Sequence, residues 1–196
     1  MKMTLRWYGP GYDSVTLEQI RQIPGVTGVI STLYDVPAGE EWTFERVKEL
    51  KDIVEAAGLK LEGIESVNIH DSIKIGSPDR DKYIDAYIKS LEALGKNDIH
   101  MVCYNFMPVF DWTRTDLAKR RPDGSTVLAY DQKVVDTIDP QTFFDQTNDS
   151  SNGFVMPGWE PERLAKVHDL FEAYKDVTSE KLFENLVYFL EAIGPV

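Results

Sequence analysis

The sequence predicts an α/β fold built on a parallel sheet. In the first hundred residues, short apolar runs typical of buried strands alternate with runs whose apolar residues recur every three or four positions, as in amphipathic helices. The strand-like runs are apolar throughout, which is expected where helices cover a parallel sheet. Four strands are expected, at residues 3–8, 26–33, 59–67 and 99–106.

The connections between these strands carry helix start and stop signals. Thr16 begins a capping box in the first connection, and Thr43 precedes the apolar stripe of the second, which Gly58 is placed to end. The third helix is expected at residues 79–94, with Gly95 as its stop. These signals predict consecutive β/α units.

After residue 106 the pattern changes. The stretch at about 106–160 carries turn signals such as "RRPDGST" and a polar run "NDSSNG", and it is far longer than an ordinary strand-to-helix connection. Helical periodicity returns at residues 160–174 and again from Ser179. We therefore expect a single domain, residues 1–196, with a long insertion after the fourth strand.

The last helix is followed by Gly194-Pro195, a pair that normally passes the chain to another strand. Four parallel strands leave open sheet edges, which natural proteins normally cover. The sequence is thus expected to be half of a larger fold, and a homo-oligomer, in the simplest case a dimer, is expected to cover the edges.

Composition excludes several classes of protein. A formal charge of −12, from 33 acidic and 21 basic residues, disfavours binding to nucleic acid. No apolar run is long enough for a membrane span, and "RWYGPG" interrupts the start too early for a signal peptide. The single cysteine, Cys103, is expected to be a small buried residue and fits a reducing compartment. A cytoplasmic location is therefore predicted.

Chemistry in a parallel α/β fold is expected at the carboxyl ends of the strands. Arginine, amide, histidine and carboxylate side chains beside aromatic rings suit a small polyhydroxy or carboxylate ligand. Trp7 and Tyr8 are more simply explained as packing residues at a strand end, and His70 beside Asp71 could be a surface pair. The candidates at the four strand ends are Arg6, Trp7, Tyr8, Tyr34, Asp35, Glu65, Ser66, Asn68, His70, Tyr104, Asn105, Asp111, Trp112 and Arg114.

Other chemistries lack their motifs. There is neither a glycine-rich phosphate loop nor a G-x-S-x-G elbow. His70, His100 and His168 are well separated, and no H-E-x-x-H or C-x-x-C motif occurs. No complete metal site is visible locally.

Three segments carry a resemblance to a known family. "RWYGPGYDSVTLEQIRQIPGVTGVISTLYDVPAGEEW", "IESVNIHDSIKIG" and "VCYNFMPVFDWTRTDL" together resemble the amino-terminal half of mannonate dehydratase. The resemblance implies a (β/α)8 TIM barrel of the xylose-isomerase-like group, of which this chain supplies the first four β/α units and the insertion. It implies a lyase that dehydrates D-mannonate to 2-keto-3-deoxygluconate in hexuronate (glucuronate) catabolism.

The resemblance also implies a Mn²⁺ or Fe²⁺ cofactor, whose ligands and the catalytic residues are expected in the family's second half, outside this sequence. No metal ligand is therefore assigned here, and the 196-residue chain alone is expected to be inactive. The residues expected to bind the substrate are Trp7, Tyr8, Glu65, His70, Asn105, Trp112 and Arg114.

Two alternatives stay open at this point. The first is a sugar isomerase or epimerase of the same barrel group, against which the "DWTR" segment argues by resemblance only. The second is a non-catalytic fragment whose strand ends bind sugar acids. Metal content, turnover and binding of D-mannonate distinguish the three readings.

Overall fold

The structure, a computed structural model, describes residues 2–109, 114–137 and 167–196. Residues 167 and 168 are described by their backbone alone. The chain divides into two compact units, residues Met1–Phe106 with Val177–Val196, and residues Met107–Asp176. The boundary falls where the long insertion was predicted to begin. A single domain over 1–196 stays a prediction.

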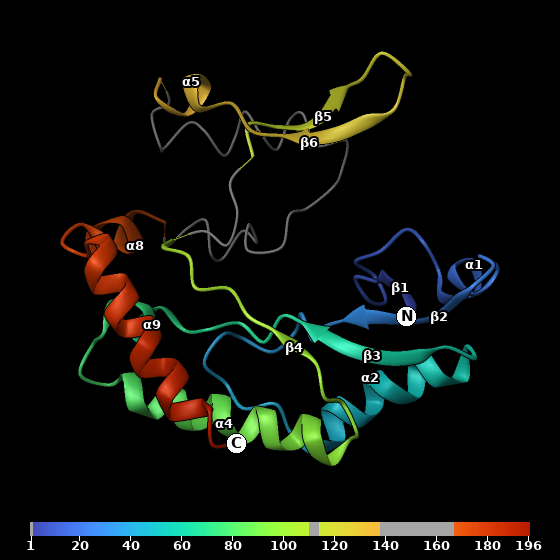
Figure 1. Cartoon of the computed structure of the whole chain (residues 1–196), viewed down its shortest axis with the longest axis horizontal. Coiled ribbons are helices and arrows are strands. Elements are labelled where there is room, and N and C mark those ends of the chain that lie inside the picture. The colour runs from blue at the N-terminus through green and yellow to red at the C-terminus, as the bar shows by residue number, and fades with distance from the viewer. Residues whose placement is uncertain (1, 110–113, 138–166) are drawn as a thin grey trace. The chain divides into compact units, whose positions relative to one another are not determined.

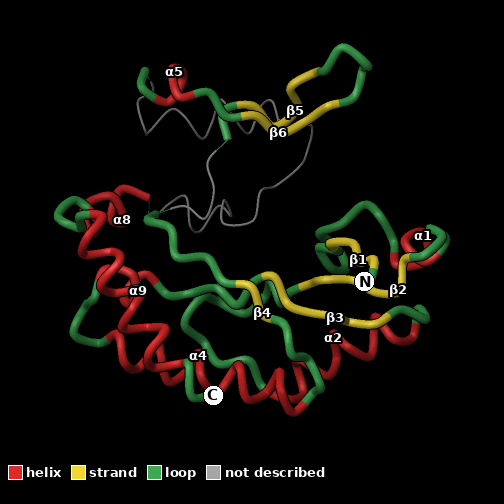
Figure 2. The backbone as a smooth tube through the Cα atoms, viewed as in Figure 1, coloured by secondary structure: helices red, strands yellow, loops and turns green. Residues whose placement is uncertain are grey.

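A four-stranded parallel sheet forms the centre of the first unit (Figure 1). Its strands are β1 (Met3–Arg6), β2 (Val26–Ser31), β3 (Lys60–Glu65) and β4 (Val102–Cys103), in the order β1-β2-β3-β4. The predicted parallel α/β architecture is confirmed. Every strand is shorter than predicted (Figure 2). The residues at each carboxyl end leave the sheet as a loop, and β3 and β4 also begin later than predicted, so that β4 keeps only two paired residues.

The helices begin where their capping residues predicted. Before α1 (Leu17–Arg21), Thr16 and Gln19 form a reciprocal capping box, and Thr43 accepts a hydrogen bond at the start of α2 (Phe44–Ala56). Further along the chain follow the short α3 (Asp71–Ile75), α4 (Arg80–Lys96) and α9 (Ser179–Ile193).

One predicted helix end is wrong. Gly95 does not stop α4 but lies inside it; the helix ends at Lys96, and Asn97 is its C-cap. The Asn97 side chain is 5% exposed and donates to the carbonyl oxygens of Ala93, at 2.9 Å, and Phe44, at 3.1 Å. Asp98 then takes the left-handed conformation, with φ 62°, that glycine usually provides. A buried amide therefore replaces the glycine stop.

The core lies between the sheet and the helices α2 and α4, which run along one side of it (Figure 1). Val29 of β2, Ile64 of β3 and Val54 of α2 are fully buried. Burial of each such side chain contributes about 1.5–3 kcal/mol, so this layer is the main source of stability.

Helix α9 joins this core although it is distant in sequence. It packs on α3 and α4. Its Phe189 is fully buried, and its ring lies 5.0 Å from that of Tyr87, 6.0 Å from Phe106 and 6.1 Å from Tyr104. The residues on both sides of Asn105 are therefore held by α9.

The second unit contains two strands and a short helix that were not predicted. An antiparallel hairpin joins β5 (Asp116–Arg120) to β6 (Thr126–Ala129), and α5 (Gln132–Val135) and α8 (Val167–Tyr174) are its described helices. Gly124, with φ 84°, lies in the hairpin turn, where "PDGS" was a usable signal. The predicted helix at 160–174 is seen from Val167 onward. Within the described part of the chain, none of the helices combines the length and apolar character needed to span a membrane.

Candidate active site

At the carboxyl ends of β1 and β2, an arginine lies beside two tyrosine rings. Because the strands are parallel, these ends lie on the same edge of the sheet. The guanidinium of Arg6 donates to Tyr34 Oη at 2.8 Å and to the Ile30 carbonyl oxygen at 3.3 Å. Its Cζ lies 4.9 Å from the centroid of the Tyr8 ring and 5.9 Å from that of Tyr34.

The loop after β1 fixes the position of Tyr8. Asp13 accepts hydrogen bonds from the backbone N–H groups of Tyr8, at 3.0 Å, and Val15, at 2.9 Å. Gly9 and Gly11 have φ of 91° and 83°, which non-glycine residues rarely adopt. The "YGPGYD" turn thus holds Tyr8 beside Arg6.

A second group joins the ends of β2, β3 and β4 through Ser66. Thr32 Oγ1 donates to the Ser66 carbonyl oxygen at 2.7 Å, and Ser66 Oγ donates to Asn68 Oδ1 at 2.9 Å. Asn105 Nδ2 donates a long hydrogen bond of 3.5 Å to Ser66 Oγ. Hydroxyl and amide groups of this kind can bind the hydroxyls of a sugar acid.

Several predicted site residues occupy different surroundings. Glu65 is exposed at the end of β3, next to Ser66, where solvent satisfies its carboxylate. Trp7 is 5% exposed and belongs to the core on the helix side of the sheet. Trp112 lies outside the described residues, and Arg114 belongs to the second unit. For these four residues, binding of substrate stays a prediction.

His70 has two packing roles. Its Nδ1 accepts a hydrogen bond from the backbone N–H of Ser72 at 3.1 Å, which caps α3, and its ring stacks on Tyr83 with centroids 3.7 Å apart. Accepting at Nδ1 requires that this nitrogen be unprotonated. Burial lowers the pKa of His70 below 6.5, although Asp71 and Asp79 nearby act in the opposite direction.

This geometry predicts a pH-dependent stability. Because the folded-state pKa of His70 is lowered, the unfolded chain binds the proton more strongly, and stability is lost as pH falls below about 6.5 toward the folded value. We expect His70→Asn, which keeps a capping acceptor but cannot titrate, to cost about 1 kcal/mol at pH 8 through lost stacking. Urea unfolding should show this difference shrinking between pH 8 and pH 5. If the difference in unfolding free energy between the two proteins were the same at pH 8 and pH 5, the lowered pKa of His70 would be contradicted.

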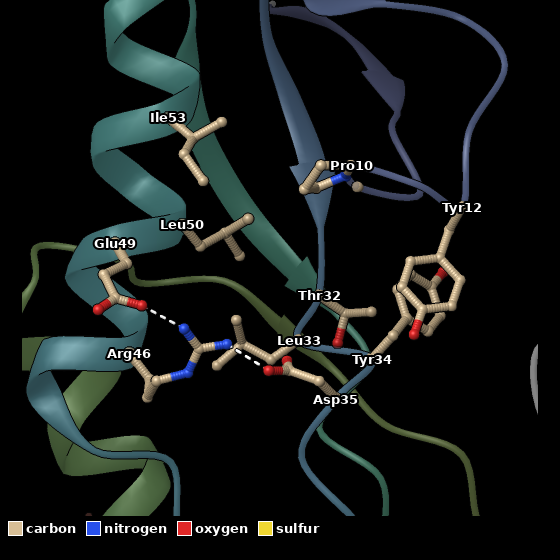
Figure 3. A pocket seen from close by; sticks show the side chains of 11 residues that line it. Pro10, Tyr12, Thr32, Leu33, Tyr34, Asp35, Arg46, Glu49, Leu50 and Ile53 are labelled. Carbon is tan, nitrogen blue, oxygen red and sulfur yellow. Dashed lines mark hydrogen bonds and ion pairs between the residues drawn. The ribbon is translucent and has the colours of Figure 1, made fainter.

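A pocket of about 270 Å³ lies between the loops after β1 and β2 and the helix α2 (Figure 3). Figure 3 shows Arg46 reaching between Glu49 and Asp35, with which it forms ion pairs. None of the five predicted substrate-binding residues of the first unit lines this pocket; they are Trp7, Tyr8, Glu65, His70 and Asn105. Its walls are Gly9, Pro10, Tyr12, Thr32, Leu33, Tyr34, Asp35, Arg46, Glu49, Leu50 and Ile53.

Tyr34 connects this pocket to the arginine cluster. Its ring lines the pocket and lies 4.8 Å from that of Tyr12, while its hydroxyl accepts from Arg6. A neighbouring pocket of about 420 Å³, which Trp7 helps to line, extends over Ile53 and α1. Tyr34 is thus shared by the pocket and the arginine cluster.

The described residues do not fit a metal centre. Among them, no three His, Cys, Asp or Glu side chains come together in a group that could hold an ion. Cys103 was predicted to be buried but is exposed, because β4 pairs through only two residues at the sheet edge.

The sequence reading named Arg6 and Tyr34 as strand-end residues but not as a pair. The hydrogen bond between Arg6 and Tyr34 links the last residue of β1 to a residue that follows β2. The spacing of residues within one strand does not show which residue of the neighbouring strand lies opposite. The usable signal was the alternation through β1 and the residue after it: Leu5 and Trp7 face the core, and Arg6 faces the other way.

Comparison with known proteins gives a consistent result. The sequence profile of the family described as D-mannonate dehydratase (UxuA) matches residues 1–196. A protein of Brachyspira hyodysenteriae named mannonate dehydratase is 68% identical over 195 residues, which cover 100% of this chain and 55% of that protein. One of Thermotoga maritima with the same name is 56% identical over 196 residues, which cover 100% and 54%.

A solved structure agrees with these relatives. The crystal structure of mannonate dehydratase from Streptococcus suis serotype 2 is similar to this chain with a TM-score of 0.82 and 42% sequence identity. The match covers 100% of this chain and 50% of that one. The chain therefore spans about half the length of the curated relatives it matches.

Proposed function

The chain belongs to the D-mannonate dehydratase (UxuA) family, and from this premise we propose that its residues take part in the dehydration of D-mannonate to 2-keto-3-deoxygluconate. The observation that carries the proposal is the family match over the whole chain, residues 1–196. The reaction would serve hexuronate catabolism in the cytoplasm.

We propose further that the sheet is the first half of a (β/α)8 barrel. In support, four parallel strands lie in sequential order, and α2 and α4 run along one side of them. In such a barrel the carboxyl ends of all strands surround one site. The Ser66 group and the Arg6 cluster would then line part of that site.

The reaction removes a proton next to the carboxylate and expels a hydroxyl from the neighbouring carbon. In this proposal the polar groups at the strand ends orient the substrate: Asn105 and the Ser66 hydroxyl bind sugar hydroxyls, and the Tyr8 ring covers an apolar face. The groups that move the proton are not assigned among the described residues.

A divalent ion, Mn²⁺ or Fe²⁺, remains part of the proposal. Such an ion stabilises negative charge that develops on substrate oxygens. As the family resemblance implies, we propose that its ligands lie in the part of the family's length that this chain does not span; among the described residues, no group of His, Cys, Asp or Glu could hold the ion. No step is assigned to the ion here.

Turnover assays test the proposed function. We expect the 196-residue chain with Mn²⁺ to show no dehydration of D-mannonate, and activity to appear when it is co-expressed with the part of the Thermotoga maritima relative that it does not match. The complementing part alone and the same mixture without metal serve as controls. Turnover by the chain alone at a rate like that of a full-length relative would refute the need for complementation.

The same samples test the assembly. We expect the isolated chain to self-associate, in the simplest case as a dimer, because β1 and β4 are unpaired edge strands within the described residues. Sedimentation equilibrium should show this association weakening when the complementing part is added. A compact monomer of the isolated chain would contradict it.

A further inference from the structure

We propose that Arg6 binds the carboxylate of the substrate and selects sugar acids over neutral polyols. This inference rests on the proposed function, because it names the residue that recognises the acid group of a mannonate-like substrate. Arg6 lies at a strand end but is not among the residues that the family resemblance predicts to bind the substrate. Three observations carry the proposal: position, charge and orientation.

The position of Arg6 follows from the alternation of side chains between the two faces of the sheet along β1 and the residue after it. Leu5 and Trp7 pack against the core on the helix side, so Arg6 between them lies on the opposite face. Arg6 is paired in register with Ile30 of β2, one residue before the end of that strand. Its side chain therefore belongs to the carboxyl-end edge, where parallel α/β folds bind their ligands.

Among the described residues, no acidic side chain pairs with the guanidinium of Arg6. The residue is half-buried, yet among the described residues it forms no ion pair, and both of its hydrogen bonds go to neutral acceptors. Arg46, by contrast, pairs with two carboxylates. Partly buried cations normally have an anionic partner, so a bound carboxylate is the group that this site lacks.

Orientation is set by the two tyrosines. The rings of Tyr8 and Tyr34 lie within cation–π distance of the guanidinium, and the Tyr34 hydroxyl holds one of its nitrogens. The two hydrogen bonds use two of five N–H donors. A guanidinium fixed in this way is ready to bind a carboxylate through two parallel hydrogen bonds, at little entropic cost.

Substitutions at Arg6 distinguish a role in binding the carboxylate from a purely structural role of this residue. Isothermal titration of the chain, and of the complemented protein, should compare D-mannonate with D-mannitol, which differs by replacement of the carboxylate with CH₂OH. We expect Arg6→Gln to bind D-mannonate about 10- to 100-fold more weakly while D-mannitol binding is unchanged. Arg6→Lys should recover part of the preference, because it keeps the charge but loses the planar fork.

A matched control is Arg21→Gln, which removes the same charge from the exposed last turn of α1. It should leave both affinities unchanged. Equal D-mannonate binding by the protein and by Arg6→Gln would overturn the role of Arg6 and leave the proposed function standing. If both affinities fall together, the role of Arg6 is structural and the proposal fails.

A panel of other acids distinguishes failure of the two proposals. If D-mannonate does not bind but D-gluconate or another sugar acid binds in an Arg6-dependent way, the carboxylate site is supported and the proposed substrate is wrong. If no acid binds more tightly than D-mannitol, both proposals are wrong.

Discussion

Replacement of Phe189 by alanine is expected to lower the free energy of unfolding of the first unit by about 3–5 kcal/mol. The Phe189 side chain is fully buried and packs on Tyr87, Tyr104 and Phe106. Its loss would leave a cavity between α9 and the core, and α9 has few other buried residues to hold it. Urea denaturation followed by circular dichroism measures the change.

Phe183→Ala is the matched control. It makes the same substitution on the same helix, but Phe183 is 64% exposed, so its loss should change stability by less than about 0.5 kcal/mol. Similar effects of the two substitutions would show that α9 does not dock through Phe189. Because Tyr104 and Phe106 flank Asn105, Phe189→Ala should also weaken sugar-acid binding.

Asn185→Leu is expected to lower the free energy of unfolding by about 2–3 kcal/mol, although leucine is similar in size and more apolar. Asn185 is 2% exposed; its Nδ2 donates to the Lys74 carbonyl oxygen at 2.9 Å, and its Oδ1 accepts from Arg80 at 3.3 Å. Leucine removes both bonds. A Cβ on Gly76 would already come within 2.5 Å of Asn185 Oδ1, so there is little room for a branched side chain.

Tyr188→Phe controls for this prediction. It removes the hydrogen bond from Tyr188 to Asp81, at 2.8 Å, while the ring keeps its contact with the Arg80 guanidinium. Because this hydrogen bond is exposed, the free energy of unfolding should fall by less than about 0.5 kcal/mol in the same denaturation assay. An equally small effect of Asn185→Leu would mean that the buried amide does not fasten α9 to α3.

Features encoded within a few residues were predictable. Thr16 and Thr43 act through backbone groups of the next turn, so their sequence positions locate the starts of α1 and α2. The parallel sheet was also predictable, because apolar strands must be covered by the helices between them.

Features set by distant contacts were not predictable. The end of α4 depends on Asn97, whose amide reaches the carbonyl of Phe44 on another helix, and this overrode the glycine signal at 95. The Arg6–Tyr34 bond depends on the β1–β2 register, which contains an irregularity near Met3. His70 was a plausible ligand by type, but its stacking on Tyr83 depends on how α4 packs.

The order in which the parts of the first unit are synthesised follows from its discontinuity. Residues 1–106 leave the ribosome before the insertion, and α9 follows only after residues 107–176. At about 5–20 residues per second, that delay is on the order of 4 to 14 seconds. During it the surface around Tyr87, Tyr104 and Phe106 has no Phe189 to cover it. The nascent chain therefore passes through an interval in which an apolar surface is open to chaperones and to aggregation.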